Sequence, residues 1–162
     1  MGKKAGSGST PAIAALTQLG IAFTAHSYTH DAAATDFGGE AAAALGVAEE
    51  RVFKTLLADV DGTLAVGIVP VSGMLGLKAL AAALGGKRAA MADPALAERR
   101  TGYVVGGISP LGQRSRLRTV LDASALAHGT VFVSGGRRGL SLELAPAELA
   151  AATGATIAEI GR

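Results

Sequence analysis

A pair of strand-like stretches joined by a two-residue turn signal constrains the fold of this chain most strongly. Residues 51–58, RVFKTLLA, read as a strand, and residues 63–69, TLAVGIV, are almost continuously apolar. Between them stands Asp61-Gly62, a dipeptide typical of tight β-hairpin turns. Because a largely apolar strand is usually covered on both faces, we expect 63–69 to lie near the centre of a sheet.

Helical and strand patterns are mixed along the rest of the 162 residues, with no repeat or linker between them. Helices are predicted over 11–19, 39–45, 76–84, 94–100 and 146–153. Further strands are predicted over 21–28, 88–91, 103–105, 118–122, 130–133, 140–144 and 155–160. The pattern indicates a single α/β (α+β) domain, in which a mixed, mostly antiparallel sheet is flanked by helices.

The first ten residues, MGKKAGSGST, are basic and contain no apolar segment, so they do not form a secretory signal. We expect residues 1–9 to be a disordered leader and residues 10–162 to form the domain. No apolar run approaches the roughly 18 residues that a transmembrane helix requires. The cytoplasm is the expected location.

Positive charge is concentrated in one segment, although the formal net charge of the chain is only +2. From Arg99 to Arg138 there are seven arginines, no lysine and one acidic residue, Asp122; this segment carries +6 and the remainder −4. Such a patch favours an anionic partner such as nucleic acid or a nucleotide. The alternative is a solvated basic edge of a sheet.

The stretch 101–118, TGYVVGGISPLGQRSRLR, combines glycines with cations. Gly106 and Gly107 have no Cβ, so their N–H groups can approach a ligand closely and form a concavity that binds anions. Guanidinium groups, which bind oxyanions through paired donors, follow at alternate positions: Arg114, Arg116 and Arg118. The pattern predicts the mouth of a pocket for a polyanionic ligand with a reactive carbonyl. A glycine-rich connection before a solvated strand is the alternative.

Lys54 is the most informative single residue. In the strand 51–58 it shares one face with Val52, Leu56 and Ala58. A lysine among apolar neighbours is costly to bury unless its charge has a partner, and an anionic ligand would supply one. The alternative is an edge-strand lysine whose ammonium group reaches solvent.

Familiar catalytic and metal-binding motifs are missing from the sequence. His26 and His30 are four residues apart but do not fit the H-E-x-x-H zinc signature. Neither Ser109 nor Ser134 lies in a G-x-S-x-G motif, and the chain contains no cysteine. We therefore expect no metal and no cofactor. The sequence favours either a binding module or an enzyme that relies on positioning, an oxyanion hole and groups on the substrate.

Seven blocks, in order along the chain, resemble the bacterial YbaK/EbsC family. They are T-P-A-I-A-A-L, H-S-Y-T-H-D, F-G-G-E-A, V-F-K-T-L-L, M-A-D, T-G-Y-V-V-G-G-I-S-P-L-G-Q and V-S-G-G-R-R-G-L-S-L-E-L-A-P. Members of that family are free-standing Cys-tRNA(Pro) deacylases related to the editing domain of bacterial prolyl-tRNA synthetases. The resemblance covers nearly the whole chain from Thr10 onward and implies the fold of that editing domain.

The resemblance also implies an activity. Family members remove cysteine from mischarged tRNA(Pro), with Cys-tRNA(Cys) as a further candidate substrate, and are thought to act in a transient complex with prolyl-tRNA synthetase. In the mechanism attributed to them, the thiol of the substrate cysteine attacks its own ester carbonyl, which releases tRNA and a cyclic thiolactone. That mechanism requires no protein nucleophile. The resemblance also implies no cofactor and no membrane partner.

Carried over position by position, the resemblance implies roles for individual residues. Lys54 matches the family's essential lysine and is expected to hold the ribose or phosphate of the terminal adenosine. The backbone loop expected to orient the ester and stabilise the oxyanion comprises Gly106, Gly107, Ile108 and Ser109. Further contacts with the substrate are expected from Tyr28, Thr55, Ser134, Gly136, Arg114 and Arg116.

Two other functions remain open on the sequence. The same pocket would hydrolyse Ala-tRNA(Pro) or another aminoacyl-tRNA if it admitted water in place of the substrate thiol. The other is a non-catalytic module that binds RNA or a synthetase. It would have the same pocket but would turn over no aminoacyl-tRNA.

Overall fold

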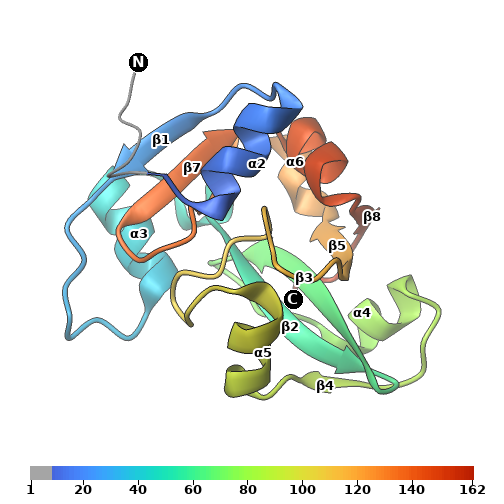
Figure 1. The fold of residues 1–162 in the computed structure, drawn as a ribbon. Coiled ribbons are helices and arrows are strands. Elements are labelled where there is room, and N and C mark those ends of the chain that lie inside the picture. The colour runs from blue at the N-terminus through green and yellow to red at the C-terminus, as the bar shows by residue number, and fades with distance from the viewer. Residues whose placement is uncertain (1–8) are drawn as a thin grey trace.

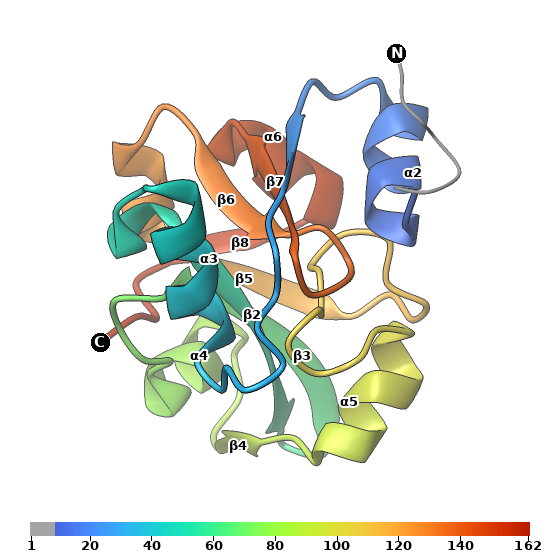
Figure 2. The same cartoon turned by 90° about the vertical axis from the view of Figure 1, so that its left-hand side faces the viewer.

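The computed structural model describes residues 9–162, and its strands divide into two sheets (Figures 1 and 2). One sheet has the order β1-β7-β6 and the other the order β4-β2-β3-β5-β8. The strands are β1 (Thr24–Ser27), β2 (Phe53–Val60), β3 (Thr63–Pro70), β4 (Ala89–Met91), β5 (Arg118–Asp122), β6 (Val131–Ser134), β7 (Leu140–Leu144) and β8 (Thr156–Ala158). Four of the six strand pairs are antiparallel, and β3–β5 and β5–β8 are parallel.

Helices cover the sheets from several sides. The α-helices within residues 9–162 are α2 (Pro11–Leu19), α3 (Phe37–Leu45), α4 (Leu77–Ala83), α5 (Pro94–Thr101) and α6 (Pro146–Thr153). Two 3₁₀ helices, η1 (Glu49–Arg51) and η2 (Ala123–Ala127), complete the connections. In both ribbon views α4 and α5 lie on opposite sides of the β2–β3 hairpin.

The predicted hairpin is confirmed. β2 and β3 pair along their whole length, from Phe53 with Pro70 to Val60 with Thr63. The turn residues Asp61 and Gly62 both have positive φ, 51° and 90°, as the tight hairpin turn requires. β3 is flanked by β2 and β5, so the expectation that it is an interior strand is also correct.

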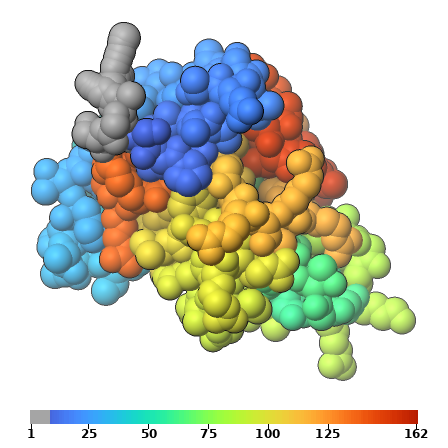
Figure 3. All heavy atoms as spheres, in the orientation of Figure 1, coloured from blue at the N-terminus to red at the C-terminus, as the bar shows by residue number. Residues whose placement is uncertain are grey.

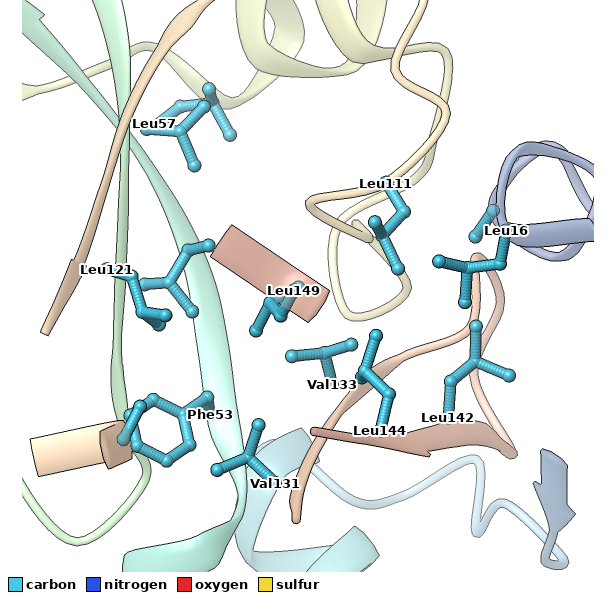
Figure 4. Close-up of a cluster of buried hydrophobic side chains, with 14 of the residues drawn as sticks. Leu16, Phe53, Leu57, Leu111, Leu121, Val131, Val133, Leu142, Leu144 and Leu149 are labelled. Carbon is cyan, nitrogen blue, oxygen red and sulfur yellow. The ribbon is translucent and has the colours of Figure 1, made fainter. Parts of the chain in front are cut away.

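The main hydrophobic core lies between the two sheets (Figure 4). Phe53 and Leu57 of β2 belong to this cluster together with Val133 and Leu142 of the smaller sheet, and Phe53 lies near Val131. A second cluster, which includes Ala58 and Leu80, packs α4 against the other face of the larger sheet. Because successive residues of β2 contribute to different clusters, the strand is apolar on both faces.

The predicted class, a single α+β domain with mixed, mostly antiparallel pairing, is confirmed, although the strands form two sheets and not one. Several boundaries differ from the prediction by a few residues. The strand expected over 21–28 is confined to Thr24–Ser27, and the helix expected from residue 39 begins at Phe37, capped by the side chain of Asp36.

The strand predicted over 103–105 is wrong, because those residues form a loop. Gly102, with φ of 83°, ends α5, and no strand pairs with the residues that follow. The Tyr103 side chain turns inward and its hydroxyl donates to the Leu111 carbonyl at 2.6 Å, while Val104 is 56% exposed. The prediction failed because one buried aromatic residue followed by two valines has the same sequence pattern as a short strand.

The disordered leader predicted for residues 1–9 falls almost entirely on residues 1–8, which lie outside the described residues. Within residues 9–162, no helix is long and apolar enough to cross a membrane.

Candidate active site

A pocket of about 320 Å³ opens where the two sheets meet. That volume is within the range of small-molecule sites. Its wall is contributed by β2, the start of α3, the β4–α5 connection, the loop after α5, and the facing ends of β6 and β7. Segments distant in sequence therefore converge on one cavity.

The exposed edge of β2 forms one side of this pocket. β4 pairs only with Ala58–Val60 of β2. One further backbone hydrogen bond forms on the β4 side, in which the Leu57 carbonyl accepts from the Ala92 N–H at 3.0 Å. The backbone groups of alternate residues in a strand point to the same side. The N–H and C=O of Thr55 therefore point to the same edge of β2 as those of Leu57. β4 is too short to pair with Thr55 at this edge.

Lys54 lines the pocket and is half-buried. Its ammonium group makes no hydrogen bond and no salt bridge with residues 9–162. The three salt bridges in this part of the chain join His26 and Arg51 to Glu143, and His30 to Glu40. A half-buried cation without a protein partner among these residues is available to an anionic or strongly polar ligand.

Thr55, next to Lys54, carries the second unpaired group. Its hydroxyl oxygen Oγ1 is buried and has no hydrogen-bond partner in the described residues. Burying a hydroxyl without a partner costs free energy, so such groups are rare in native proteins. Both residues lie on the wall of the same pocket, as expected for substrate contacts.

The glycine loop is brought to the pocket, but its four predicted residues are not equivalent. Val105, Gly106 and Ile108 line the cavity. The N–H of Gly107 already donates to the Val104 carbonyl at 2.9 Å. Ser109 is 0% exposed and its Oγ accepts from the Leu111 N–H at 3.2 Å, so it shapes the loop from inside. The amides of Gly106, Ile108 and Ser109 have no protein acceptor within residues 9–162, and of these three residues Gly106 and Ile108 line the cavity.

Tyr28 also lines the pocket, opposite β2. Burial raises the pKa of its phenol, so the hydroxyl stays protonated near neutral pH and can donate a hydrogen bond. Its backbone N–H donates to the Gly139 carbonyl at 2.9 Å, which ties β1 to the β6–β7 turn.

His26 and His30 each have a carboxylate partner. His30 Nδ1 lies 2.8 Å from Glu40 Oε1, and the Asp31 N–H donates to Glu40 Oε2 at 2.7 Å. These two hydrogen bonds lower the pKa of the Glu40 carboxyl, and the bond from the Asp31 N–H has the larger effect. His26 Nε2 lies 2.9 Å from Glu143 Oε1. Within residues 9–162 no group of three or more potential metal ligands is assembled.

Ser134 is at the pocket wall, as predicted, and its Oγ accepts from the Gly136 N–H at 3.2 Å. Gly136 does not line the cavity; it packs against Tyr103 and Thr10. Arg114 and Arg116 also lie outside the pocket wall, exposed on the surface beyond α5. Three of the predicted contacts therefore support or surround the pocket.

Sequence reasoning missed a second side of the pocket. Phe37 and Gly38, at the start of α3, and Met91 and Pro94, around the start of α5, all line it. The F-G-G-E-A and M-A-D blocks were the available signals, because the first begins α3 and the second comes directly before α5.

Asp36 is a further missed residue, and it is a carboxylate at the pocket wall. Its Oδ1 accepts from the Gly39 N–H at 3.0 Å and so caps α3. None of the pocket hydroxyls among residues 9–162 is hydrogen-bonded to a histidine or carboxylate. The described site can bind a polar ester and polarise its carbonyl, but it holds no activated nucleophile of the familiar kind.

Comparison with known proteins finds a family and relatives. Residues 32–152 match the model of the aminoacyl-tRNA editing domain. A relative from Enterococcus faecalis, described as a candidate Cys-tRNA(Pro)/Cys-tRNA(Cys) deacylase and called EbsC, is 38% identical over 120 residues, 74% of this chain and 73% of its own.

Solved structures with the same fold are also found. A hypothetical protein, APE2540, superposes with a TM-score of 0.85 at 28% identity, covering 94% of this chain and 100% of the other. A protein described as a candidate trans-editing enzyme for prolyl-tRNA synthetase gives 0.80 at 26% identity, covering 95% and 98%.

The fold and the matched domain define an enzyme that edits aminoacyl-tRNA by deacylation. Within that class, the chain belongs to the YbaK/EbsC family.

Proposed function

We propose that this protein is a trans-editing deacylase that removes cysteine from mischarged tRNA(Pro). The observation that carries the proposal is the unpaired Lys54 ammonium, which shares a pocket with the free amides of Gly106 and Ile108. Donors fixed in advance stabilise the charge that develops on an ester oxygen during acyl transfer. The relative from E. faecalis carries the corresponding description.

In the proposed reaction the substrate supplies its own nucleophile. The cysteinyl sulfur bonds to the ester carbonyl carbon, the bond from that carbon to the ribose 3′ oxygen breaks, and the thiol proton ends on the leaving oxygen. The products are tRNA with a free 3′ hydroxyl and a cyclic thiolactone. This route fits a pocket that holds the ester but contains no serine paired with a base among the described residues.

Each pocket group has a proposed part in that reaction. Lys54 holds the ribose or phosphate of the terminal adenosine. The amides of Gly106 and Ile108 face the developing oxyanion, while Gly107 and Ser109 keep the loop in shape. The open carbonyl of Thr55 accepts from the substrate's α-ammonium group. Tyr28 and Ser134 border the aminoacyl end.

A deacylation assay tests the proposal. Purified protein is incubated with Cys-tRNA(Pro), Ala-tRNA(Pro) and Ser-tRNA(Pro), and the released product is identified by mass spectrometry. We expect rapid loss of cysteine with thiolactone as the first product, and slow loss of alanine and serine. Equal rates on all three would contradict the role of the thiol.

Asp36 supports a second candidate function, hydrolysis of Ala-tRNA(Pro) or another aminoacyl-tRNA with water as nucleophile. A carboxylate at the pocket wall can orient and deprotonate a water molecule. Asp36→Asn separates the two, because asparagine still caps a helix but cannot act as a base. A large loss of activity in this variant would favour hydrolysis, whereas near-normal activity favours the thiol route.

The proposed setting follows from the proposed substrate. The enzyme would act in the cytoplasm, on tRNA released from prolyl-tRNA synthetase or within a transient complex with it. Pull-down of the synthetase in the presence of tRNA(Pro) tests that partner.

A further inference from the structure

Helix α5 connects the pocket to a group of arginines. Pro94 and Ala97, in the first half of α5, line the pocket, while Arg99 and Arg100 occupy its last turn. Six residues at 1.5 Å each separate Pro94 from Arg100, which is a distance of about 9 Å along the helix axis. The basic end of α5 is thus only a short way from the cavity.

The loop after α5 returns to this helix end and adds two more arginines. The Arg114 N–H donates to the Thr101 carbonyl and the Ser115 N–H to the Arg100 carbonyl, both at 2.9 Å. Side chains strengthen the contact, because Arg100 Nε donates to Ser115 Oγ at 3.1 Å. The four residues of what we call the α5 arginine cluster are Arg99, Arg100, Arg114 and Arg116.

All four guanidinium groups belong to exposed residues. None forms a salt bridge with any carboxylate of residues 9–162. Glu98 is in no salt bridge with them, and its Oε2 accepts from the Val105 N–H at 2.8 Å. A helix C-terminus favours cations, which accounts for Arg99 and Arg100 but not for Arg114 and Arg116 on the loop.

Exposed apolar side chains lie at the pocket wall and beside it. Val104 is 56% exposed, Met91 51% and Val105 37%, and the last two also line the cavity. Figure 3 shows α5 and the following loop, coloured yellow to gold, as a continuous exposed surface on this face. Apolar groups at a pocket mouth can contact nucleobases, while arginines beside them bind phosphates.

We propose that the α5 arginine cluster binds the phosphodiester backbone of the acceptor stem, while the single-stranded 3′ end of the tRNA crosses Val104 and Val105 to the pocket. This inference rests on the proposed aminoacyl-tRNA substrate, and it assigns recognition of the stem to a surface separate from the site that holds the ester.

The test compares a long and a short substrate. Arg114→Gln/Arg116→Gln is assayed on Cys-tRNA(Pro) and on a cysteinylated CCA trinucleotide, which has no acceptor stem. The ratio of kcat/KM on the long substrate to kcat/KM on the short one should fall about tenfold or more, because each lost phosphate contact weakens binding of the stem. The helix pair Arg99→Gln/Arg100→Gln should lower the same ratio.

A binding measurement makes the test independent of catalysis. An uncharged acceptor-stem RNA hairpin is titrated by fluorescence anisotropy between 50 and 300 mM KCl. Removing two phosphate contacts should reduce the slope of log K against log salt by about 1.4 to 1.8. The matched control, Lys78→Gln/Lys87→Gln, removes two exposed charges near α4 and should leave both the slope and the ratio unchanged.

The outcomes separate the two proposals. An unchanged slope in both arginine pairs, or an equal change in the lysine control, would overturn the cluster as the stem-binding surface. A reduced slope without any deacylation of Cys-tRNA(Pro) would retain the RNA-binding surface and overturn the proposed function instead. Thermal unfolding of each variant confirms that the fold is intact.

Discussion

The guanidinium of Arg138 donates two hydrogen bonds to the carbonyl oxygen of Val105, at 3.1 Å from Nε and 2.5 Å from Nη2. The same guanidinium lies over the ring of Phe37, 4.6 Å from its centroid. The β6–β7 turn, the start of α3 and the glycine loop are therefore joined through one side chain. We infer that Arg138 positions Gly106, which lines the pocket and whose N–H has no acceptor within residues 9–162.

Replacing Arg138 with alanine should lower kcat about tenfold and change KM little. The substituted protein keeps its pocket, but the loop amides are no longer held where the oxyanion forms, and a tenfold effect corresponds to about 1.4 kcal/mol. Arg137→Ala, at an exposed neighbouring position, is the control and should retain near-normal kcat. Steady-state kinetics of both variants test this prediction. An equal loss of kcat in the two variants would contradict a positioning role for Arg138.

Gly106→Ala should destabilise the loop and reduce activity at least tenfold. Gly106 has φ of 91°, and an added Cβ would lie 2.6 Å from Arg138 Nε and 3.0 Å from the Phe37 ring. An L-residue in this backbone region costs about 1–2 kcal/mol even without a clash. Denaturant unfolding and the deacylation assay measure the two effects.

The control for that substitution is Gly154→Ala. Gly154 also has positive φ, 67°, but an added Cβ would meet nothing within 4 Å, and it ends α6 outside the pocket wall. This variant should lose about 1 kcal/mol of stability and keep its activity. If both glycine variants lost activity equally, backbone strain alone would explain the result.

Thr55→Val should separate stability from function. The Thr55 hydroxyl is buried without a partner, so its replacement by a methyl group of similar size should leave the melting temperature unchanged or raise it. If Oγ1 binds the substrate, kcat/KM should nevertheless fall about tenfold, since the bond lost is worth roughly 1 kcal/mol or more. A variant that is stable and fully active would show that the hydroxyl has no part in binding.

Asp122 should make stability depend on pH in the acid range. Burial alone would raise the pKa of this carboxyl, but hydrogen bonds from Ser124, Gly161 and Ile160 outweigh burial and lower it. A group whose pKa is lowered on folding stabilises the protein above its unfolded pKa of about 3.9, and that stabilisation is lost as the pH falls further.

Asp122→Asn tests this expectation. At pH 7 we expect a loss of about 1–3 kcal/mol, because the amide cannot replace every hydrogen bond that the carboxylate accepts. Urea unfolding from pH 7 to pH 3 should show the difference between the two proteins shrinking below about pH 4. A difference that stays constant to pH 3 would mean that the carboxylate charge contributes nothing.

Local patterns predicted much of the fold from the sequence. Asp61-Gly62 specified its turn through backbone dihedral angles. Thr10 and Asp93, each followed by proline, are typical helix-capping residues, and each side chain accepts from an N–H three residues later. The division of the strands into two sheets was not predictable, because it depends on packing between β2 and β6 across the core.

The candidate site was predicted unevenly for the same reason. Lys54 was recognisable as a cation on an apolar strand, and it does line the pocket. Gly136 and Ser109 belong to blocks that resemble the family, but the first packs against Tyr103 and the second is buried. No periodicity could reveal that Arg138 reaches Val105, since the contact joins residues 33 positions apart.

The most direct test of the account is the rate at which Lys54→Ala deacylates Cys-tRNA(Pro), with Lys78→Ala as a control for loss of one lysine charge. We expect kcat/KM to fall at least about 100-fold in the Lys54 variant, with an unchanged melting temperature and a normal rate in the control. A Lys54 variant that folds and works within about threefold of the unsubstituted protein would contradict the assignment of this pocket as the active site.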